Sequence, residues 1–356
     1  MNHAEEILKK AAGRRRITDE DALRLFAEAD LLELGQCAQA CAAVFHPYDS
    51  VTFIIDRNIN YTNICTSRCR FCAFYREESS PDAYLLSREQ IMVKVAEAVS
   101  RGATQIMLQG GLHPSLSLDY ILSLLREIKE RFSVCIHSFS PPEISRFAQR
   151  SGLDVPEILS RLREAGLDSL PGGGAEILSD RVRDIVSPCK IKAGEWLSIM
   201  EAAHGQGMKS TATMVIGNVE TQEERVGHLR CIRHLQDKTG GFRAFIPWSF
   251  KTAHTELEGG EISALDYLRT LAVSRIYLDN IENIQGSWVT QGPDIGQIAL
   301  YFGANDLGSI MLEENVVRAA GASYCLTEEE MVSLIRRAGK TPAQRNTEYA
   351  IIKRYP

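Results

Sequence analysis

The chain has 356 residues, of which 44% are hydrophobic and 24% charged, and its formal net charge is −6. This is the composition of an ordinary globular protein, with enough apolar residues for one large barrel or two smaller domains. The negative charge argues against general electrostatic attraction to nucleic acid. The sequence has no run of about 18 apolar residues, which excludes a membrane-spanning helix.

The first segment, residues 1–49, mixes charged and apolar residues at helical spacing and predicts helices. It is charged almost from the start and lacks the apolar stretch of a signal peptide, so we expect a cytoplasmic protein. The chain contains nine cysteines, an odd number for a disulfide framework. In a reducing compartment, clustered thiols more often indicate metal binding or catalysis.

From residue 50 onward, apolar runs alternate with polar or glycine-rich loops and amphipathic helices. Capping boxes at Ser87 and Gln90, and at Thr221 and Glu224, mark the starts of two of these helices. Alternating strands and helices predict a parallel sheet, and about eight repeats in roughly 260 residues favour a (β/α)8 barrel over an open doubly wound sheet. The predicted strands are 51–56, 104–109, 134–139, 168–171, 211–216, 243–248, 283–288 and 306–311.

The last segment, residues 312–356, contains another capping box at Thr327 and Glu330. We expect it to supply a helix that closes one end of the barrel. The sequence therefore predicts three parts: an N-terminal helical segment (1–49), the barrel (50–311) and a C-terminal helical extension packed on the barrel (312–356).

Three cysteines follow the first predicted strand, at the strand end where such barrels have their active site. Cys65, Cys69 and Cys72 have C-x3-C-x2-C spacing. Three thiolates this close can bind three irons of a [4Fe–4S] cluster and leave the fourth iron open, whereas an electron-transfer cluster normally takes four cysteines. The open iron indicates a small ligand, and the spacing suggests S-adenosylmethionine. A zinc-binding structural protein is the alternative, but zinc would need a further ligand, and the next histidine is His113.

Residues close to the cysteines and after the second strand are candidate contacts of S-adenosylmethionine. Phe71 and Tyr75 adjoin Cys72 and would shield the cluster or flank the adenine. Gly110 and Gly111, which follow Gln109, remove side chains where backbone must approach a ligand. Carbonyls at this strand end can accept hydrogen bonds from a free amino group.

The later strand ends carry further cofactor candidates. Glu176 follows three glycines and can accept hydrogen bonds from ribose hydroxyls, and Arg183 can pair with a carboxylate. A solvated helix charge is an equally good interpretation of Arg183. Thr213 and Gly217 belong to a segment shaped like G-x-I-x-G-x-x-E with the first glycine replaced, which would pack around an adenine. Ser140 either contacts the cofactor or lies in a stiff loop that caps the next helix.

Five residues at strand ends are candidate substrate contacts. His113 can transfer protons near neutral pH, although a structural hydrogen bond is the simpler interpretation. Ser138 and Glu143 follow the third strand and can contact cofactor or substrate. Trp288 and Gln291 lie at the end of the seventh strand, where they would line a substrate pocket.

The cysteine spacing, with Phe71 before the last cysteine, resembles the signature of the radical SAM superfamily. Longer segments are similar to those of the menaquinone-pathway radical SAM enzymes of the futalosine route. The resemblance covers nearly everything from residue 50 onward, with Thr213 as one departure from the general superfamily pattern. The segments are 58–63 (NINYTN), 72–76 (CAFYR), 108–111 (LQGG), 137–143 (HSFSPPE), 166–176 (GLDSLPGGGAE), 287–292 (SWVTQG) and 311–316 (MLEENV).

This resemblance implies a radical SAM barrel that binds a [4Fe–4S] cluster and S-adenosylmethionine. It also implies a one-electron reductant protein, such as a flavodoxin or ferredoxin, and a nucleoside-like substrate. The implied reaction is removal of the C4′ hydrogen of dehypoxanthine futalosine by a 5′-deoxyadenosyl radical, followed by addition of the carbon radical to the benzoate ring. Segments 140–143 and 288–291 favour this cyclase over aminofutalosine synthase or a related deazaflavin-pathway enzyme. We expect neither a nucleic-acid nor a membrane partner.

Overall fold

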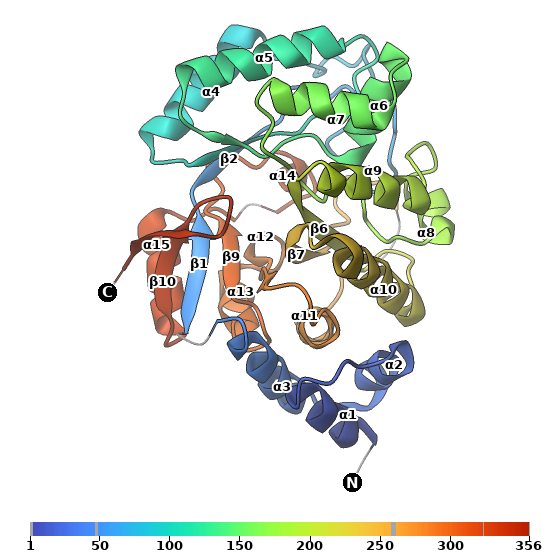
Figure 1. Cartoon of the computed structure of the whole chain (residues 1–356), viewed down its shortest axis with the longest axis vertical. Helices are drawn as coiled ribbons and strands as arrows, with labels where there is room; N and C mark the ends of the chain where they lie inside the picture. The colour runs from blue at the N-terminus through green and yellow to red at the C-terminus, as the bar shows by residue number, and fades with distance from the viewer. Residues whose placement is uncertain (1–2, 47–48, 258–260, 323, 356) are drawn as a thin grey trace.

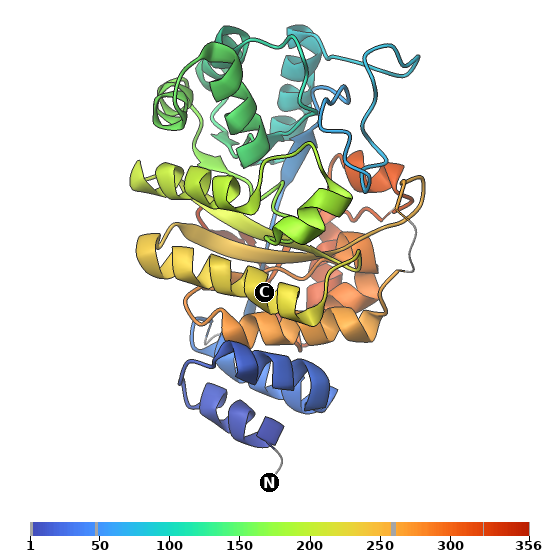
Figure 2. The same cartoon turned by 90° about the vertical axis from the view of Figure 1, so that its right-hand side faces the viewer.

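The computed structural model describes residues 3–46, 49–257, 261–322 and 324–355. Strands occupy the centre and helices surround them (Figure 1; Figure 2). None of the described helices is both long and apolar enough to cross a membrane. The strands are β1 (Ser50–Ile54), β2 (Asp56–Ile59), β3 (Gln105–Leu108), β4 (Cys135–Ile136), β5 (Ser169–Leu170), β6 (Lys209–Ile216), β7 (Phe242–Ser249), β8 (Asn283–Ile284), β9 (Asp306–Ser309), β10 (Thr341–Arg345) and β11 (Ile351–Arg354).

The helices flank the strands and begin mostly at side-chain caps, including the three predicted capping boxes. They are α1 (His3–Ala12), α2 (Asp19–Glu28), α3 (Leu31–Ala43), α4 (Arg88–Ser100), α5 (Leu118–Arg131), α6 (Pro141–Ser151), α7 (Val155–Glu164), α8 (Asp180–Val186), α9 (Ala193–Gly205), α10 (Gln222–Thr239), α11 (Ala264–Tyr277), α12 (Trp288–Gln291), α13 (Pro293–Ala299), α14 (Val316–Ala319) and α15 (Glu328–Arg337).

The strand order is that of a parallel (β/α)8 barrel, which confirms the predicted fold class. β1 and β2 share the first position: β1 pairs with β9, and β2 pairs with β3. β3 pairs with β4, and β5 to β8 form a ladder in sequence order. Parallel single-residue bridges, His137 to Ser169 and Gln285 to Asp306, link β4 to β5 and β8 to β9.

Each predicted strand overlaps an observed one, although β4 (Cys135–Ile136) is shorter than predicted and two other strands differ in position. The first predicted strand breaks at Ile55 into β1 and β2. The seventh was predicted to reach Trp288, but β8 ends at Ile284 and Trp288 begins α12. Close packing explains this end, because a Cβ on Gly296 would lie 2.4 Å from the Cβ of Trp288.

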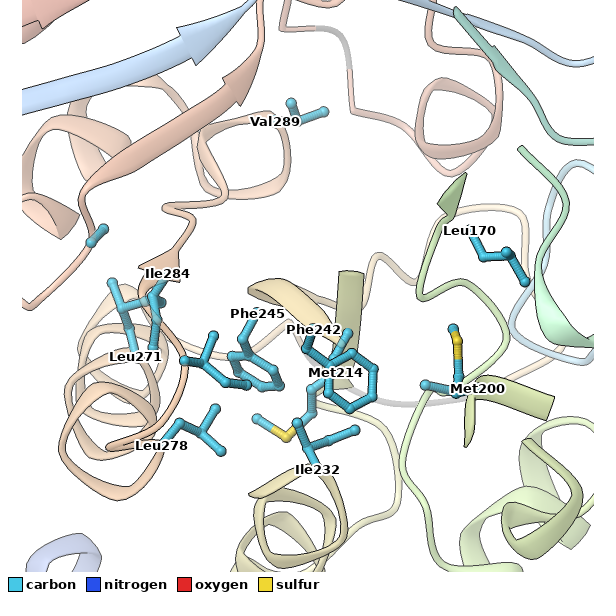
Figure 3. Close-up of a cluster of buried hydrophobic side chains, with 14 of the residues drawn as sticks. Leu170, Met200, Met214, Ile232, Phe242, Phe245, Leu271, Leu278, Ile284 and Val289 are labelled. Atoms are coloured by element: carbon cyan, nitrogen blue, oxygen red, sulfur yellow. The ribbon is translucent and has the colours of Figure 1, made fainter. Parts of the chain in front are cut away.

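The alternation of side chains along β6 separates the hydrophobic core from the inside of the barrel. Ala212 and Met214 are fully buried on the outer face, whereas Thr211, Thr213 and Val215 point inward and are half-buried. This alternation follows from the two-residue period of a strand. Figure 3 shows the outer core, in which Phe245 of β7 and Met214 lie beside apolar side chains of α10 and α11. Inward-facing positions are therefore free to line a cavity.

The N-terminal helices pack against the outer helices of the barrel (Figure 1). Arg233 of α10 donates a hydrogen bond to the Ile17 carbonyl at 3.0 Å, and Arg269 of α11 donates to the Ala29 carbonyl at 2.7 Å. The Tyr277 hydroxyl donates to Asp19. The helices α1 to α3 therefore support α10 and α11 from outside.

The C-terminal extension contains the expected helix, α15, and also two strands that the sequence analysis did not predict. β10 pairs in parallel with β1, and β11 pairs antiparallel with β10 (Figure 1). The loop after β10 brings Thr347 and Tyr349 to the wall of the central cavity. The extension thus contributes to the inside of the barrel, while the domain boundaries at 49/50 and 311/312 stay a prediction.

A buried histidine on α9 should make stability depend on pH. The two ring nitrogens of His204 lie 2.8 Å from Thr239 Oγ1 and 2.7 Å from Ser210 Oγ. Burial lowers the pKa of His204 to about 4. Below the unfolded pKa, near 6.5, the unfolded chain therefore takes up a proton that the native imidazole does not, so stability is lost as the pH falls.

Relative to His204→Gln, we expect the free energy of unfolding of the wild type to fall by about 1.4 kcal/mol per pH unit below the unfolded pKa, until the native ring titrates. Urea unfolding of both proteins at several pH values measures this difference. A difference that does not change with pH would contradict the expectation.

Candidate active site

A cavity of about 420 Å³ lies inside the barrel and reaches the loops at the C-terminal ends of the strands. Residues of β2, β3, β6, β7 and β9 and of the C-terminal extension line it. Twelve of the predicted site residues are among its lining: Cys65, Cys69, Phe71, Cys72, Tyr75, Gln109, Gly110, Gly111, Ser140, Glu143, Glu176 and Thr213. The structure thus brings together segments that are up to 150 residues apart.

The three cysteines lie in the loop between β2 and α4. Cys69 is buried, and Cys65 and Cys72 are half-buried. Burial raises the pKa of the Cys69 thiol to about 12 and also raises that of Cys72. The side chains of the described residues include no group of three or more His, Cys, Asp or Glu placed to hold a metal ion. Three thiols along one cavity wall instead suit a cluster that takes one thiolate at each of three irons.

The paired glycines after β3 permit the close approach of this strand to the cysteine loop. A Cβ on Gly111 would lie 2.2 Å from the Ile64 carbonyl oxygen and 2.9 Å from the Cβ of Cys65. A Cβ on Gly110 would lie 2.6 Å from the Tyr61 ring. These positions exclude any larger residue without a backbone shift, because the protein itself packs against them. The contact of this glycine cradle, Gly110 and Gly111, with a cofactor stays a prediction.

Glu143 holds this cradle in place. It is 2% exposed and accepts four hydrogen bonds, from Tyr61 Oη at 2.8 Å, Gly110 N at 3.2 Å, Ser140 N at 2.8 Å and Ser140 Oγ at 2.7 Å. Burial raises the pKa of Glu143. Ser140 was expected either to contact the cofactor or to cap the next helix, and Glu143 to contact cofactor or substrate. The structure shows the cap: the two side chains bind each other at the start of α6. Their contacts assign them to positioning Gly110.

Glu176 also lines the cavity and is already ion-paired. Its Oε1 lies 2.9 Å from Lys190 Nζ, and its Oε2 lies 3.3 Å from Arg183 Nη1. Lys190 also lies over the Phe71 ring, with its Nζ 5.2 Å from the centroid. The proximity of Cys69 and Glu176 raises the pKa of Lys190 against the effect of burial. Sequence reasoning missed Lys190, since no motif spacing marks a lysine in this loop.

Thr213, the departure from the superfamily pattern, has a structural explanation. Its hydroxyl donates to the Gly172 carbonyl at 2.6 Å, and a Cβ on Gly172 would lie 2.7 Å from the Thr213 nitrogen. This hydrogen bond therefore holds the glycine-rich loop, which follows β5, against β6.

Six predicted site residues do not line the cavity. Arg183 is buried and donates to the carbonyls of Gly174, Ala175 and Ile191, so it is neither a solvated charge nor a ligand contact. Ser138 Oγ accepts from Leu108 N at 2.8 Å. The backbone N–H of Ser115 donates to His113 Nδ1 at 3.1 Å.

The other three of these residues are also engaged in hydrogen bonds with other groups of the protein. The Trp288 indole donates to the Leu307 carbonyl at 2.9 Å and is 1% exposed, so it does not reach a substrate pocket. Gln291 donates to Ser249 Oγ at 2.5 Å, and only Ser249 of this pair lines the cavity. The Gly217 N–H donates to Glu220 Oε1 at 2.7 Å, and its φ of +95° explains the glycine.

The inner end of the cavity is polar, and the sequence patterns did not predict most of the residues that line it. Arg243, Arg345 and Tyr349 line it together with His137. Burial and the two arginines lower the pKa of His137 to about 3, so the imidazole is neutral at pH 7. The two arginines come from other strands, β7 and β10, and carried no local signal in the sequence.

Comparisons with known proteins agree with this geometry. The family model of the radical SAM superfamily matches residues 59–232, and the model of the CofH/MqnC C-terminal region matches residues 239–355. Methylornithine synthase, a solved structure, superimposes with a TM-score of 0.75 at 20% identity, covering 95% of this chain and 97% of that chain. This likeness concerns the fold.

Relatives match over most of their length. A protein of Halalkalibacterium halodurans named cyclic dehypoxanthine futalosine synthase is 46% identical over 351 residues, covering 98% of this chain and 95% of the relative. A protein of Methanopyrus kandleri named 5-amino-6-(D-ribitylamino)uracil–L-tyrosine 4-hydroxyphenyl transferase is 42% identical over 316 residues, covering 86% of each.

The chain therefore belongs to the radical SAM superfamily, and within it to the family that includes cyclic dehypoxanthine futalosine synthase. Enzymes of the superfamily use a [4Fe–4S] cluster and S-adenosylmethionine, which confirms the predicted cofactors. Membership in an enzyme family also removes the zinc-binding structural alternative.

Proposed function

We propose that this protein is a radical SAM cyclase that converts dehypoxanthine futalosine to cyclic dehypoxanthinyl futalosine in menaquinone biosynthesis. The observation that carries the proposal is the 46% identity over nearly the full length of the Halalkalibacterium halodurans synthase. The cysteine loop and glycine cradle on one shared cavity support it. Cluster and S-adenosylmethionine, when bound, would supply the 5′-deoxyadenosyl radical that removes the C4′ hydrogen of the sugar.

In this proposal the chain's own residues bind the reactants and hold them in position. Cys65, Cys69 and Cys72 hold the cluster, and the backbone at Gly110 and Gly111 approaches the bound S-adenosylmethionine. Binding both molecules inside a barrel places the reacting atoms together and keeps water and stray hydrogen donors out. Phe71, Tyr75, Gln109, Glu176 and Thr213 remain proposed to surround the cofactor. A flavodoxin or ferredoxin is proposed as the electron donor.

The test is anaerobic incubation of the reconstituted protein with reductant, S-adenosylmethionine and dehypoxanthine futalosine. We expect 5′-deoxyadenosine together with a product that has lost two hydrogens. Deoxyadenosine without that product would keep the radical chemistry and reject the substrate.

A second candidate follows from the relatives named as transferases. The Methanopyrus kandleri protein covers 86% of this chain, so transfer of the 4-hydroxyphenyl group of tyrosine to 5-amino-6-(D-ribitylamino)uracil is the competing activity. Incubation with that pair of substrates, in parallel with dehypoxanthine futalosine, separates the two candidates.

A further inference from the structure

Four carboxylate side chains among the described residues line the cavity, and two of them are fully engaged by protein partners. Glu143 accepts four hydrogen bonds, and Glu176 is ion-paired to Lys190 and Arg183. Asp56 accepts a hydrogen bond from Gln105 at 2.7 Å and is buried, with 7% of its surface exposed. The fourth carboxylate, Glu314, is only half-buried.

Glu314 follows β9 and has one oxygen to spare. Its Oε1 accepts hydrogen bonds from Val316 N at 2.8 Å and Val317 N at 2.9 Å. Its Oε2 has a 3.5 Å contact with Asn58 Nδ2, at the outer limit of a hydrogen bond. No lysine or arginine of the described chain forms an ion pair with Glu314. Burial raises its pKa, and the neighbouring Asp56 adds to this effect.

Asn58, on β2, carries a second unused acceptor. Its Oδ1 is buried and has no hydrogen-bond partner, although the side chain lines the cavity. A buried polar atom without a partner is destabilising and rare, so a structure that keeps one often uses it for a ligand. Glu314, in the loop after β9, and Asn58, on β2, together form an acceptor pair at the cavity wall.

We propose that Glu314 and Asn58 bind hydroxyl groups of the substrate's sugar. Two neighbouring acceptors with free capacity suit two hydroxyl donors, and carboxylates are commonly used to bind ribose hydroxyls. The same acceptors repel an anionic group, so they do not hold the benzoate end of the substrate. The pair would thereby fix the sugar whose C4′ hydrogen is removed, and this role rests on the proposed function.

The neighbouring residue provides a matched control. Glu313 pairs with Arg57 at 2.6 Å and with Lys94 at 2.8 Å and is not among the cavity residues. A Glu313→Gln variant therefore removes a carboxylate at the adjacent position without touching the proposed subsite. Glu314→Gln keeps an oxygen for the two backbone N–H groups and replaces the free acceptor by a donor.

The experiment measures dissociation constants by calorimetry in the presence of S-adenosylmethionine and without reductant, so that no turnover occurs. The ligands are dehypoxanthine futalosine and an analogue without the sugar hydroxyls. We expect wild type and Glu313→Gln to bind the analogue about 10- to 100-fold more weakly than the substrate. Glu314→Gln should bind both ligands with about equal affinity, and Asn58→Ala should lose part of the preference.

Each outcome has one meaning. If Glu314→Gln keeps the full preference for the hydroxylated ligand, the inference is wrong and the proposed function is untouched. If Glu314→Gln instead weakens S-adenosylmethionine binding alone, the subsite belongs to the cofactor, which also overturns the inference. If wild type binds neither ligand, the proposed substrate is wrong and the inference fails with it. Should Glu314→Gln not fold, as judged by circular dichroism, Asn58→Ala carries the same test.

Discussion

A Cys69→Ala variant should lose bound iron and all product formation. Cys69 is buried, and the described residues that line the cavity offer only Cys65 and Cys72 as other thiols. Two thiolates leave a cluster with too few ligands to stay bound. Because the reactive species originates at the cluster, we expect a fall of at least a thousandfold in 5′-deoxyadenosine formation, which is the loss of the entire chemical step.

Iron content after anaerobic reconstitution and the spectrum of the reduced cluster check this result independently of turnover. Cys231→Ala, on α10 and outside the cavity lining, is the matched control and should keep its iron. A Cys69→Ala protein that still holds a complete cluster and forms 5′-deoxyadenosine would contradict the assignment of Cys69 as a ligand.

An Arg345→Met variant should be destabilised by about 3 to 5 kcal/mol, because it leaves a buried charge without its partner. Asp306 is completely buried and accepts from Arg345 through both oxygens, at 2.6 and 3.0 Å. Thr52 and Gly308 also donate to this carboxylate. The ion pair joins β10 to β9, so its loss should also weaken the attachment of the hairpin formed by β10 and β11.

Urea unfolding measures the difference, with Arg354→Met as the control. Arg354 lies on the exposed strand β11, where a substitution should change stability by less than about 0.5 kcal/mol. Arg345→Lys should fall between wild type and Arg345→Met, because a lysine keeps the charge but not the bidentate geometry. Equal stability of Arg345→Met and Arg354→Met would show that the ion pair has no net value.

Local patterns were enough to predict the barrel and the cysteine loop. The strands of the barrel carry apolar runs bounded by glycine or polar loops, and thiol spacing is a property of a few consecutive residues. β10 and β11 escaped prediction because a strand that contains Pro342 and a fully exposed strand lack that pattern. Their formation depends on the pairing of β10 with β1, nearly 300 residues earlier.

The predicted site residues show the same contrast between local sequence signals and contacts between distant segments. Gly110 and Gly111 were predicted to let the backbone approach a ligand, and the close neighbours in the structure are Tyr61 and the cysteine loop. Arg183 and Trp288 were assigned to ligands, but partners from other segments bury both side chains. Lys190 was overlooked for the converse reason: its importance comes from Glu176 and Phe71, which only the folded chain places beside it.

The C-terminal hairpin, formed by β10 and β11, lets both of the regions that match family models line the same cavity. The cysteine loop belongs to the first region, while Glu314 and Arg345 belong to the second. Substitutions in the second region could therefore change the part of the cavity lined by Glu314 and Arg345 while the cysteine loop stays the same. Relatives that are similar over most of this chain but carry different names are what such a division of labour would produce.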